Sequence, residues 1–146
     1  MPVYAGQNLT AGQFNRLQPR PSEVTASGNL ALTTTEADVP GTALTLATTA
    51  ANAVYVATAT FSFDITTATT AFASGALDVD GSAPSGQARW SGEVGTDFGP
   101  AVQQWSGTLP AVGNHTFKLR GSMSSGTGIT ILGAYTRLIV VIYEVV

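Results

Sequence analysis

The side chains that could carry chemistry in this sequence are few and lie far apart. Asp78 and Asp80 stand two residues apart in Asp-Val-Asp-Gly, a spacing that places both carboxylates on one face of an extended strand. The stretch lacks the third acidic position and the final glutamate that an EF-hand calcium loop needs. We interpret it as a hairpin end that leads into Gly81, and a weak cation site between subunits is the alternative.

The chain has one histidine, His115, and no cysteine. Disulfides and thiolate metal ligands are therefore excluded, and no second imidazole exists to share a metal ion. His115 follows a turn and begins an alternating segment, so we expect an exposed or hydrogen-bonded surface residue. The Gly-rich segments lack the Gly-Lys-Ser/Thr ending of a phosphate-binding loop. We expect no catalytic residue, no metal, no cofactor and hence no enzymatic activity.

Two tryptophans, Trp90 and Trp105, are the remaining candidates for ligand contact. Aromatic faces stack on sugar rings, so one interpretation is contact with a host surface glycan. The other is packing in the core or at an interface, because aromatic side chains dominate the energetics of burial. The residue types alone favour packing.

The composition indicates a protein with few charges. Of the 146 residues, 44% are hydrophobic and only 10% are charged, against roughly 25% charged residues in a typical soluble domain. Either uncharged polar residues (Thr, Ser, Asn and Gln) make up most of the solvent-exposed surface, or an assembly buries much of that surface. We favour an assembly. A net charge of −3 with six scattered basic residues argues against a nucleic-acid partner. No apolar run is long enough for a bilayer span, and the first residues do not form a secretory signal, so we expect no membrane partner.

The first 26 residues differ in pattern from the rest and predict an arm. Thr10 has the spacing of a capping box with Gln13, and Leu9 and Phe14 have that of a hydrophobic staple, which predicts a short helix over about residues 11–18. The prolines that follow end this helix and favour an extended spacer. Packing of the helix on its own domain is the alternative. The docking residues of the arm are then Leu9, Thr10, Phe14 and Leu17.

Residues 27–146 show only strand signals. Short alternating runs with turn signals every 8–12 residues predict an all-β fold, an antiparallel jelly roll or β-sandwich of eight to ten strands with a short N-terminal helical arm. The runs that we assign to strands are 29–35, 42–48, 53–65, 75–80, 87–94, 101–109, 115–122, 129–132 and 134–146.

The last of these runs is apolar on both faces, which is typical of a central strand. One face is expected to pack in the sandwich interior. The other is covered either by a second layer of the same chain or by a neighbouring subunit. The subunit-interface residues on that face are Tyr135, Ile139, Val141 and Tyr143.

Both ends of the chain resemble proteins of phage particles. Residues 1–19 resemble the opening of small virion proteins from tailed phages of actinobacteria. Residues 113–121, the Gly/Ser/Thr loop after them and residues 135–143 are similar to the last two strands of jelly-roll domains in phage decoration, fibre and minor tail proteins. The resemblance covers roughly a third of the chain. It implies a structural virion protein, often trimeric, with no catalytic residues to carry over.

A capped helix followed by a proline spacer suits a protein that anchors to a shell, and the chain lacks the heptads or repeats of a fibre shaft. The predicted function is capsid stabilisation by a homotrimeric bacteriophage capsid decoration (cement) protein, whose arm docks on the major capsid protein. Such a protein is made in the host cytoplasm without a signal peptide and lies on the capsid surface of the virion. The alternatives are a minor tail protein and a host-glycan-binding adhesion domain.

Overall fold

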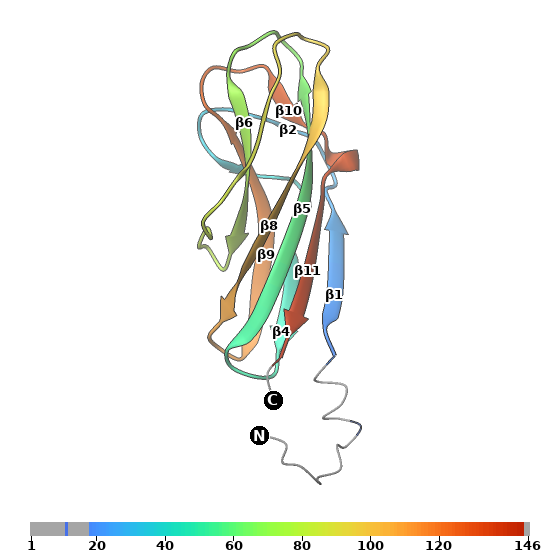
Figure 1. Ribbon diagram of the computed structural model, residues 1–146, viewed down its shortest axis with the longest axis vertical. Helices are drawn as coiled ribbons and strands as arrows, with labels where there is room; N and C mark the ends of the chain where they lie inside the picture. The colour runs from blue at the N-terminus through green and yellow to red at the C-terminus, as the bar shows by residue number, and fades with distance from the viewer. Residues whose placement is uncertain (1–10, 12–17, 145–146) are drawn as a thin grey trace.

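The protein is a two-layer β-sandwich, seen in a computed structural model that describes residue 11 and residues 18–144. Two antiparallel sheets pack face to face and enclose the hydrophobic core (Figure 1). The expected all-β, antiparallel sandwich is confirmed. The docking residues Leu9, Thr10, Phe14 and Leu17 lie outside the described residues, as does all of the predicted arm helix except residues 11 and 18.

The larger sheet is built around the longest strand, β5 (Ala53–Ile65). One edge of β5 pairs along almost its whole length with β8 (Phe98–Leu109). The other edge is shared by β11 (Arg137–Tyr143), opposite residues 54–60, and β10 (Ile129–Ile131), opposite residues 63–65. β1 (Arg20–Thr25) pairs with β11, and β2 (Leu30–Ala31) pairs with β10.

The smaller sheet is built around β9 (Gly113–Met123) and β6 (Phe72–Val79), which pair with each other. β7 (Ala88–Ser91) pairs with β6, which confirms the hairpin expected there. β3 (Ala37–Asp38) and β4 (Leu44–Thr48) pair with β9. A single 3₁₀ turn, η1 (Gly133–Tyr135), connects β10 to β11.

The core lies between the two inner faces and follows the period of two expected for strands. Every second residue of β5, from Ala53 to Ile65, is at most 5% exposed. Phe117 and Leu119 of β9 face them from the other sheet, and the rings of Tyr55 and Phe117 meet edge to face at 5.2 Å. The inward orientation of Phe117 and Leu119 predicted from the alternation is therefore confirmed.

The structure differs from the sequence prediction at residues 20–26. This segment was assigned to the arm, but residues 20–25 form β1 and Ala26 is buried in the core. Proline cannot donate a ladder hydrogen bond, yet Pro21 lies on an edge strand, where such a donor is dispensable. A proline-rich pattern was therefore compatible with a strand as well as a spacer. The division between arm and sandwich stays a prediction for the residues before 18.

Of the strand predicted over residues 29–35, only the two residues of β2 form a strand. The Thr33 hydroxyl donates to the Thr35 carbonyl (3.0 Å) and accepts from the Thr35 N–H (3.2 Å), so local side-chain bonds replace the ladder. The described residues contain eleven strands, and β2 and β3 have only two residues each. None of the helical segments in residues 18–144 has the length and apolarity of a bilayer-spanning helix.

Candidate functional site

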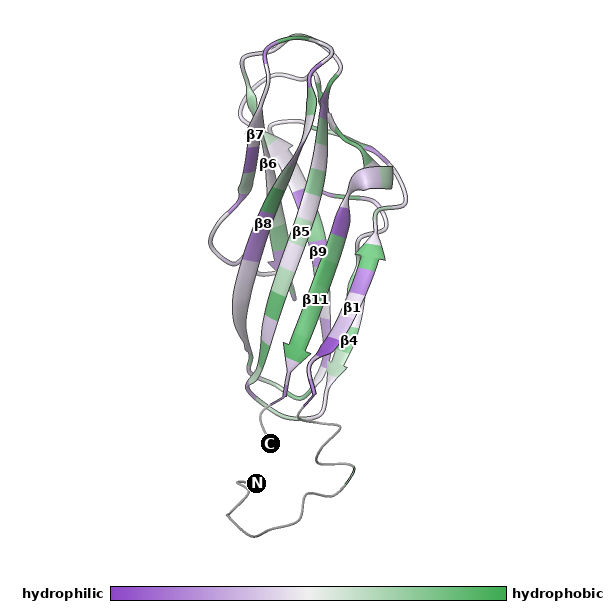
Figure 2. Ribbon diagram, turned by 45° about the vertical axis from the view of Figure 1, so that its right-hand side comes forward, coloured by the Kyte–Doolittle hydropathy of each residue, from purple (hydrophilic) through white to green (hydrophobic). Residues whose placement is uncertain are grey.

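The candidate site is the outer face of the larger sheet, where β8, β5, β11 and β1 lie side by side (Figure 2). β11 lies between β1 and β5, so its predicted central position is confirmed. Leu138, Val140 and Ile142 point inward and are at most 2% exposed. The alternate residues Ile139 and Val141 point outward and are partly exposed. Within residues 18–144 no second layer covers this outer face.

The lower part of this face is apolar across two strands. In the β5–β11 register Val56 is opposite Val141, and Val54 is opposite Tyr143. Val54 is 37% and Tyr143 43% exposed, which is high for such side chains in a sheet. We call the five residues Val54, Val56, Ile139, Val141 and Tyr143 the apolar band.

The charges near the apolar band neutralise each other. Arg137 Nη1 lies 3.5 Å from Glu23 Oε2, and both side chains are exposed. Exposed pairs of this kind contribute little to stability. The apolar band is therefore a weakly charged, open surface at one end of the sheet face.

The upper part of the face is a groove of about 570 Å³. Two aromatic side chains flank it, Phe98 at the start of β8 and Tyr135 in η1, and they are 74% and 70% exposed. We call this feature the aromatic groove. Its lining residues are Thr60, Ser62, Asp64, Phe98, Pro100, Leu132 and Tyr135.

A break in the sheet between β10 and β11 positions Tyr135. Opposite this break, the Leu132 N–H donates to the Ser62 carbonyl (2.8 Å), and the Ser62 N–H donates to Thr136 Oγ1 (3.1 Å). Thr136 Oγ1 in turn donates to the Leu132 carbonyl (2.9 Å). These bonds hold β5 to both ends of η1 while the turn itself bulges from the sheet (Figure 1). Tyr135 is therefore held beside the groove.

The turn also needs the glycine at its first position. An added Cβ on Gly133 would lie 2.4 Å from the Gly28 carbonyl oxygen, which is closer than real side chains come. The Gly133 N–H donates to Asn29 Oδ1 (2.9 Å). The conformation of the turn is thus fixed by the close approach of Gly133 to Gly28 and by the hydrogen bond to Asn29.

The floor of the aromatic groove is polar. Thr60, Ser62 and Asp64 alternate along β5, and in the register Asp64 is opposite Phe98. Ser62 is 8% exposed, and no hydrogen bond of its hydroxyl is found among the described residues. Within the same residues, the Asp64 carboxylate forms neither an ion pair nor a hydrogen bond. The groove therefore combines apolar walls with a hydroxyl and a carboxylate that have no hydrogen-bond partner among the described residues.

The structure separates the predicted interface residues into two groups. Ile139, Val141 and Tyr143 belong to the apolar band, whereas Tyr135 lies at the groove, beyond Arg137. The 3₁₀ turn ends the alternation on which their common face was predicted. Phe98 and Asp64 were not predicted as site residues. An aromatic residue inside the Gly- and Pro-rich segment 95–100 was the sequence signal for Phe98.

The two tryptophans do not form a sugar platform together. Trp105 is 3% exposed, and its Nε1–H donates to the Gly86 carbonyl (2.8 Å), so its ring has no open face. Trp90 stacks on Phe63 with ring centroids 6.0 Å apart. Packing is thus the interpretation that the structure supports for both.

His115 is not an exposed residue, contrary to the surface position expected for it. It is 5% exposed, with Nδ1 2.6 Å from Asp80 Oδ2 and Nε2 3.0 Å from the Ala111 carbonyl oxygen. The hydrogen bond to Asp80 raises the pKa of His115 above its ordinary value. The expected hydrogen bonding is confirmed, and the pair connects β9 to the end of β6.

Asp78 and Asp80 point to different partners. Asp78 Oδ1 accepts from the Gly81 N–H (2.9 Å), while Asp80 accepts from the Thr116 N–H (2.7 Å). Asp80 has φ 53°, so the backbone turns there and the strand alternation ends. The reciprocal bonds between Val79 and Ser82 confirm the hairpin-end interpretation. Within residues 18–144 no group of three acidic or histidine side chains is arranged to hold a metal ion.

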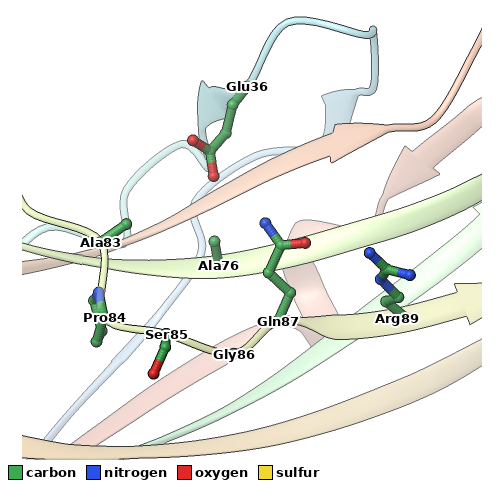
Figure 3. A pocket seen from close by; sticks show the side chains of 8 residues that line it. All are labelled: Glu36, Ala76, Ala83, Pro84, Ser85, Gly86, Gln87 and Arg89. Atoms are coloured by element: carbon green, nitrogen blue, oxygen red, sulfur yellow. The ribbon is translucent and has the colours of Figure 1, made fainter.

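A second hollow, of about 430 Å³, lies over β6 on the smaller sheet (Figure 3). Glu36 and Arg89 are the charged residues that line it. Glu36 Oε2 lies 3.0 Å from Arg120 Nη1, and the Arg89 guanidinium lies 4.6 Å from the centroid of the Phe72 ring. Because both charges already have partners within the protein, the hollow is a weaker candidate than the aromatic groove.

Several solved structures resemble this protein in fold at low sequence identity. Murine APRIL is 7% identical over 85% of this chain and 98% of its own, with a TM-score of 0.53. Latent PorU from Porphyromonas gingivalis is 7% identical over 86% of this chain and 13% of its own, with a TM-score of 0.48. VP2 of infectious bursal disease virus is 12% identical over 88% of this chain and 38% of its own, with a TM-score of 0.43.

No protein-family model matches the sequence, and no curated protein matches it either. At 7% identity, the likeness to murine APRIL concerns the fold alone. It confirms that the sandwich is of the jelly-roll type, as the strand pattern predicted.

Proposed function

We propose that this protein is a non-enzymatic structural protein whose β-sandwiches assemble through the apolar band. The observation that carries the proposal is the open sheet face on which Val56, Ile139 and Val141 lie together, flanked by the partly exposed Val54 and Tyr143. Apolar patches on soluble proteins mark interaction sites, and depletion of charge is typical of interface centres. A chain with 10% charged residues fits burial of this surface.

The partner that we propose for this face is a second and a third copy of the same chain. In a homotrimer the three sandwiches surround a threefold axis, and apolar bands that face this axis are buried together. An interface of standard size buries about 1,600 Å² in total, or about 800 Å² on each partner.

The biological setting that we propose is the surface of a bacteriophage capsid. The resemblance of both chain ends to virion proteins of tailed actinobacterial phages supports it, as does the paucity of charge. In this proposal the segment before residue 18 docks on the major capsid protein, and many weak contacts over the shell add up by multivalency. A minor tail protein is the second candidate, and it rests on the same resemblance.

The oligomeric state tests the assembly proposal. One chain has a mass of 14.9 kDa, so we expect a particle of about 45 kDa by light scattering or sedimentation. Val141→Asp places a charge in the apolar band and should yield folded monomers. Val112→Asp is the matched control, because Val112 is 59% exposed in the turn between β8 and β9. A monomeric wild-type protein would contradict the proposal.

The capsid setting requires a separate test. Deletion of residues 1–17 leaves β1 and its pairing with β11 intact, so the sandwich should still fold. We expect the full chain to co-sediment with empty capsids of its phage and the shortened chain to remain in solution. If the full chain does not bind capsids or protect them against heat, the decoration role is wrong even where the trimer forms.

A further inference from the structure

We propose that the aromatic groove is a binding site for a neutral saccharide. The site is formed by Phe98 and Tyr135 as walls and by Thr60, Ser62 and Asp64 as floor. It is separate from the apolar band, and the inference does not depend on how the protein assembles.

The walls suit the apolar faces of a sugar ring. Phe98 and Tyr135 are 74% and 70% exposed, and they come from segments that are far apart in the sequence. Leaving two large aromatic surfaces in water is unfavourable, and aromatic faces bind through apolar contact and their quadrupole. The C–H groups on one face of a pyranose ring provide a matching surface for such rings.

The floor suits the hydroxyl groups of the same ring. Thr60 and Ser62 provide oxygens that both donate and accept hydrogen bonds, and the Asp64 carboxylate only accepts them. A sugar hydroxyl that donates to a carboxylate forms one of the stronger hydrogen bonds available to a neutral ligand. The hydroxyl of Ser62 and the carboxylate of Asp64 have no competing partner among the described residues.

Charge and size restrict the ligand class. Asp64 is the one charged residue among those that line the groove, so it disfavours uronic acids and other anionic sugars. The volume of about 570 Å³ lies within the range of roughly 300–1,000 Å³ found for small-molecule sites. A polyol offers hydroxyl donors to both Ser62 and Asp64, so their burial beneath such a ligand leaves neither group without a hydrogen bond.

The position of the groove keeps it accessible. Its lining residues Asp64 and Phe98 belong to the end of β5 and the start of β8. These strand ends lie at the end of the sandwich away from the start of β1 and the end of β11 (Figure 1). The apolar band lies at the other end of the same sheet face, beyond Arg137. A subunit contact on the band therefore leaves the rings of Phe98 and Tyr135 open.

The experiment is a titration of the full chain, by calorimetry and saturation-transfer NMR, with glucose, galactose, N-acetylglucosamine, cellobiose, lactose and chitobiose. Glucuronate is the anionic comparison. We expect at least one neutral sugar to bind with a dissociation constant on the order of 1 mM and glucuronate to bind more weakly. Phe98→Ala, Tyr135→Ala and Asp64→Asn should each weaken that binding about tenfold, because tenfold corresponds to about 1.4 kcal/mol, the scale of one good contact.

Val112→Ala is the control, because Val112 is an exposed apolar residue outside both the groove and the apolar band. It should leave sugar binding unchanged. Thermal melting checks that each variant is folded. Because Phe98 and Tyr135 are highly exposed, their replacement by Ala should leave the melting temperature close to that of the wild-type protein. Absence of binding by every neutral sugar, or equal loss of binding in Val112→Ala, would overturn the proposal.

Discussion

Arg20 Nη2 lies 2.7 Å from Glu144 Oε1 and connects the beginning of β1 to the residue that follows β11. The same oxygen accepts from the Thr49 N–H (2.6 Å), and Oε2 accepts from the Thr49 hydroxyl (2.7 Å). The Glu144 side chain is 2% exposed. One buried carboxylate therefore joins three segments at the end of the sandwich where β1 begins.

Glu144→Ala should lower the free energy of unfolding by about 2 kcal/mol, because it removes the acceptor of three hydrogen bonds, one of them from a guanidinium. Urea denaturation measures the loss. Glu23→Ala is the control, because its pair with Arg137 spans 3.5 Å between exposed groups and should contribute close to zero. Equal losses of unfolding free energy in Glu144→Ala and Glu23→Ala would contradict the stabilising role of the Glu144 carboxylate.

The same carboxylate predicts a loss of stability in acid. Burial opposes ionisation of Glu144, but the hydrogen bonds from Thr49 and the charge of Arg20 outweigh it and lower its pKa below the ordinary 4.5. A lowered folded-state pKa stabilises the protein above pH 4.5, and this contribution is lost as pH falls through the lowered pKa. Denaturation curves of the wild-type protein and Glu144→Gln should converge in that acidic range. A stability difference between the wild-type protein and Glu144→Gln that stays constant down to the lowest pH would contradict the lowered pKa of Glu144.

His115 predicts a pH dependence of the opposite sign. Its hydrogen bond to Asp80 raises the pKa of His115 above 6.5, so the contribution of the charged pair is complete below pH 6.5 and is lost as pH rises through the raised pKa. As the single histidine, it gives one NMR titration curve, whose midpoint should lie above 6.5. Asp80→Asn should move the midpoint down. A midpoint at or below 6.5 in the wild-type protein would contradict the charged pair.

Gly75 makes room for the Phe61 ring in the core. The residue is opposite Gly121 in the β6–β9 register, and an added Cβ would lie 2.6 Å from atoms of that ring. Gly75→Ala should therefore cost about 1–3 kcal/mol of the free energy of unfolding. The loss should shrink in a Phe61→Leu background, a coupling that a double-mutant cycle measures. Gly95→Ala is the control, because an added Cβ there would lie 3.7 Å from the Ala68 backbone nitrogen, an ordinary van der Waals contact.

Thr136→Val tests the hydrogen bonds that hold η1. The change keeps the shape of the side chain but leaves the buried Ser62 N–H without its acceptor, which should cost about 1–3 kcal/mol. Urea denaturation measures the cost. Because Thr136 also holds the Leu132 carbonyl, amide exchange at residues 132–136 should accelerate more than exchange in β9. Uniform acceleration would show that the effect is global.

The strand pattern predicted the sandwich because the period-two alternation of a strand can be seen within the strand's own residues. In the run at 53–65, Ala, Tyr, Phe and Ile alternate with a second face that changes from Val to Thr, Ser and Asp, and β5 has those same bounds. The prediction failed for residues 20–25, whose strand conformation depends on pairing with β11. β1 contains Pro21, and only its place at the edge of the sheet makes that proline acceptable.

The candidate site was less predictable than the fold. Val141 and Ile139 could be placed on one face of a strand from their spacing alone. The aromatic groove depends on Phe98 of β8 and Tyr135 of η1 reaching the same part of β5, and no local pattern contains that pairing. His115 was assigned to the surface because its inward position depends on Asp80, 35 residues earlier.

By itself the sequence determined the alternation of apolar and polar residues, the shortage of charge and the absence of cysteine, and hence an all-β sandwich whose last strand is apolar on both faces. The tertiary structure decided which of two apolar faces of β11 became core and which stayed open. It also decided that the break between β10 and β11 holds Tyr135 beside Asp64. The physical reason is that alternation is a property of consecutive residues, whereas strand order and register arise from contacts between segments far apart in the chain.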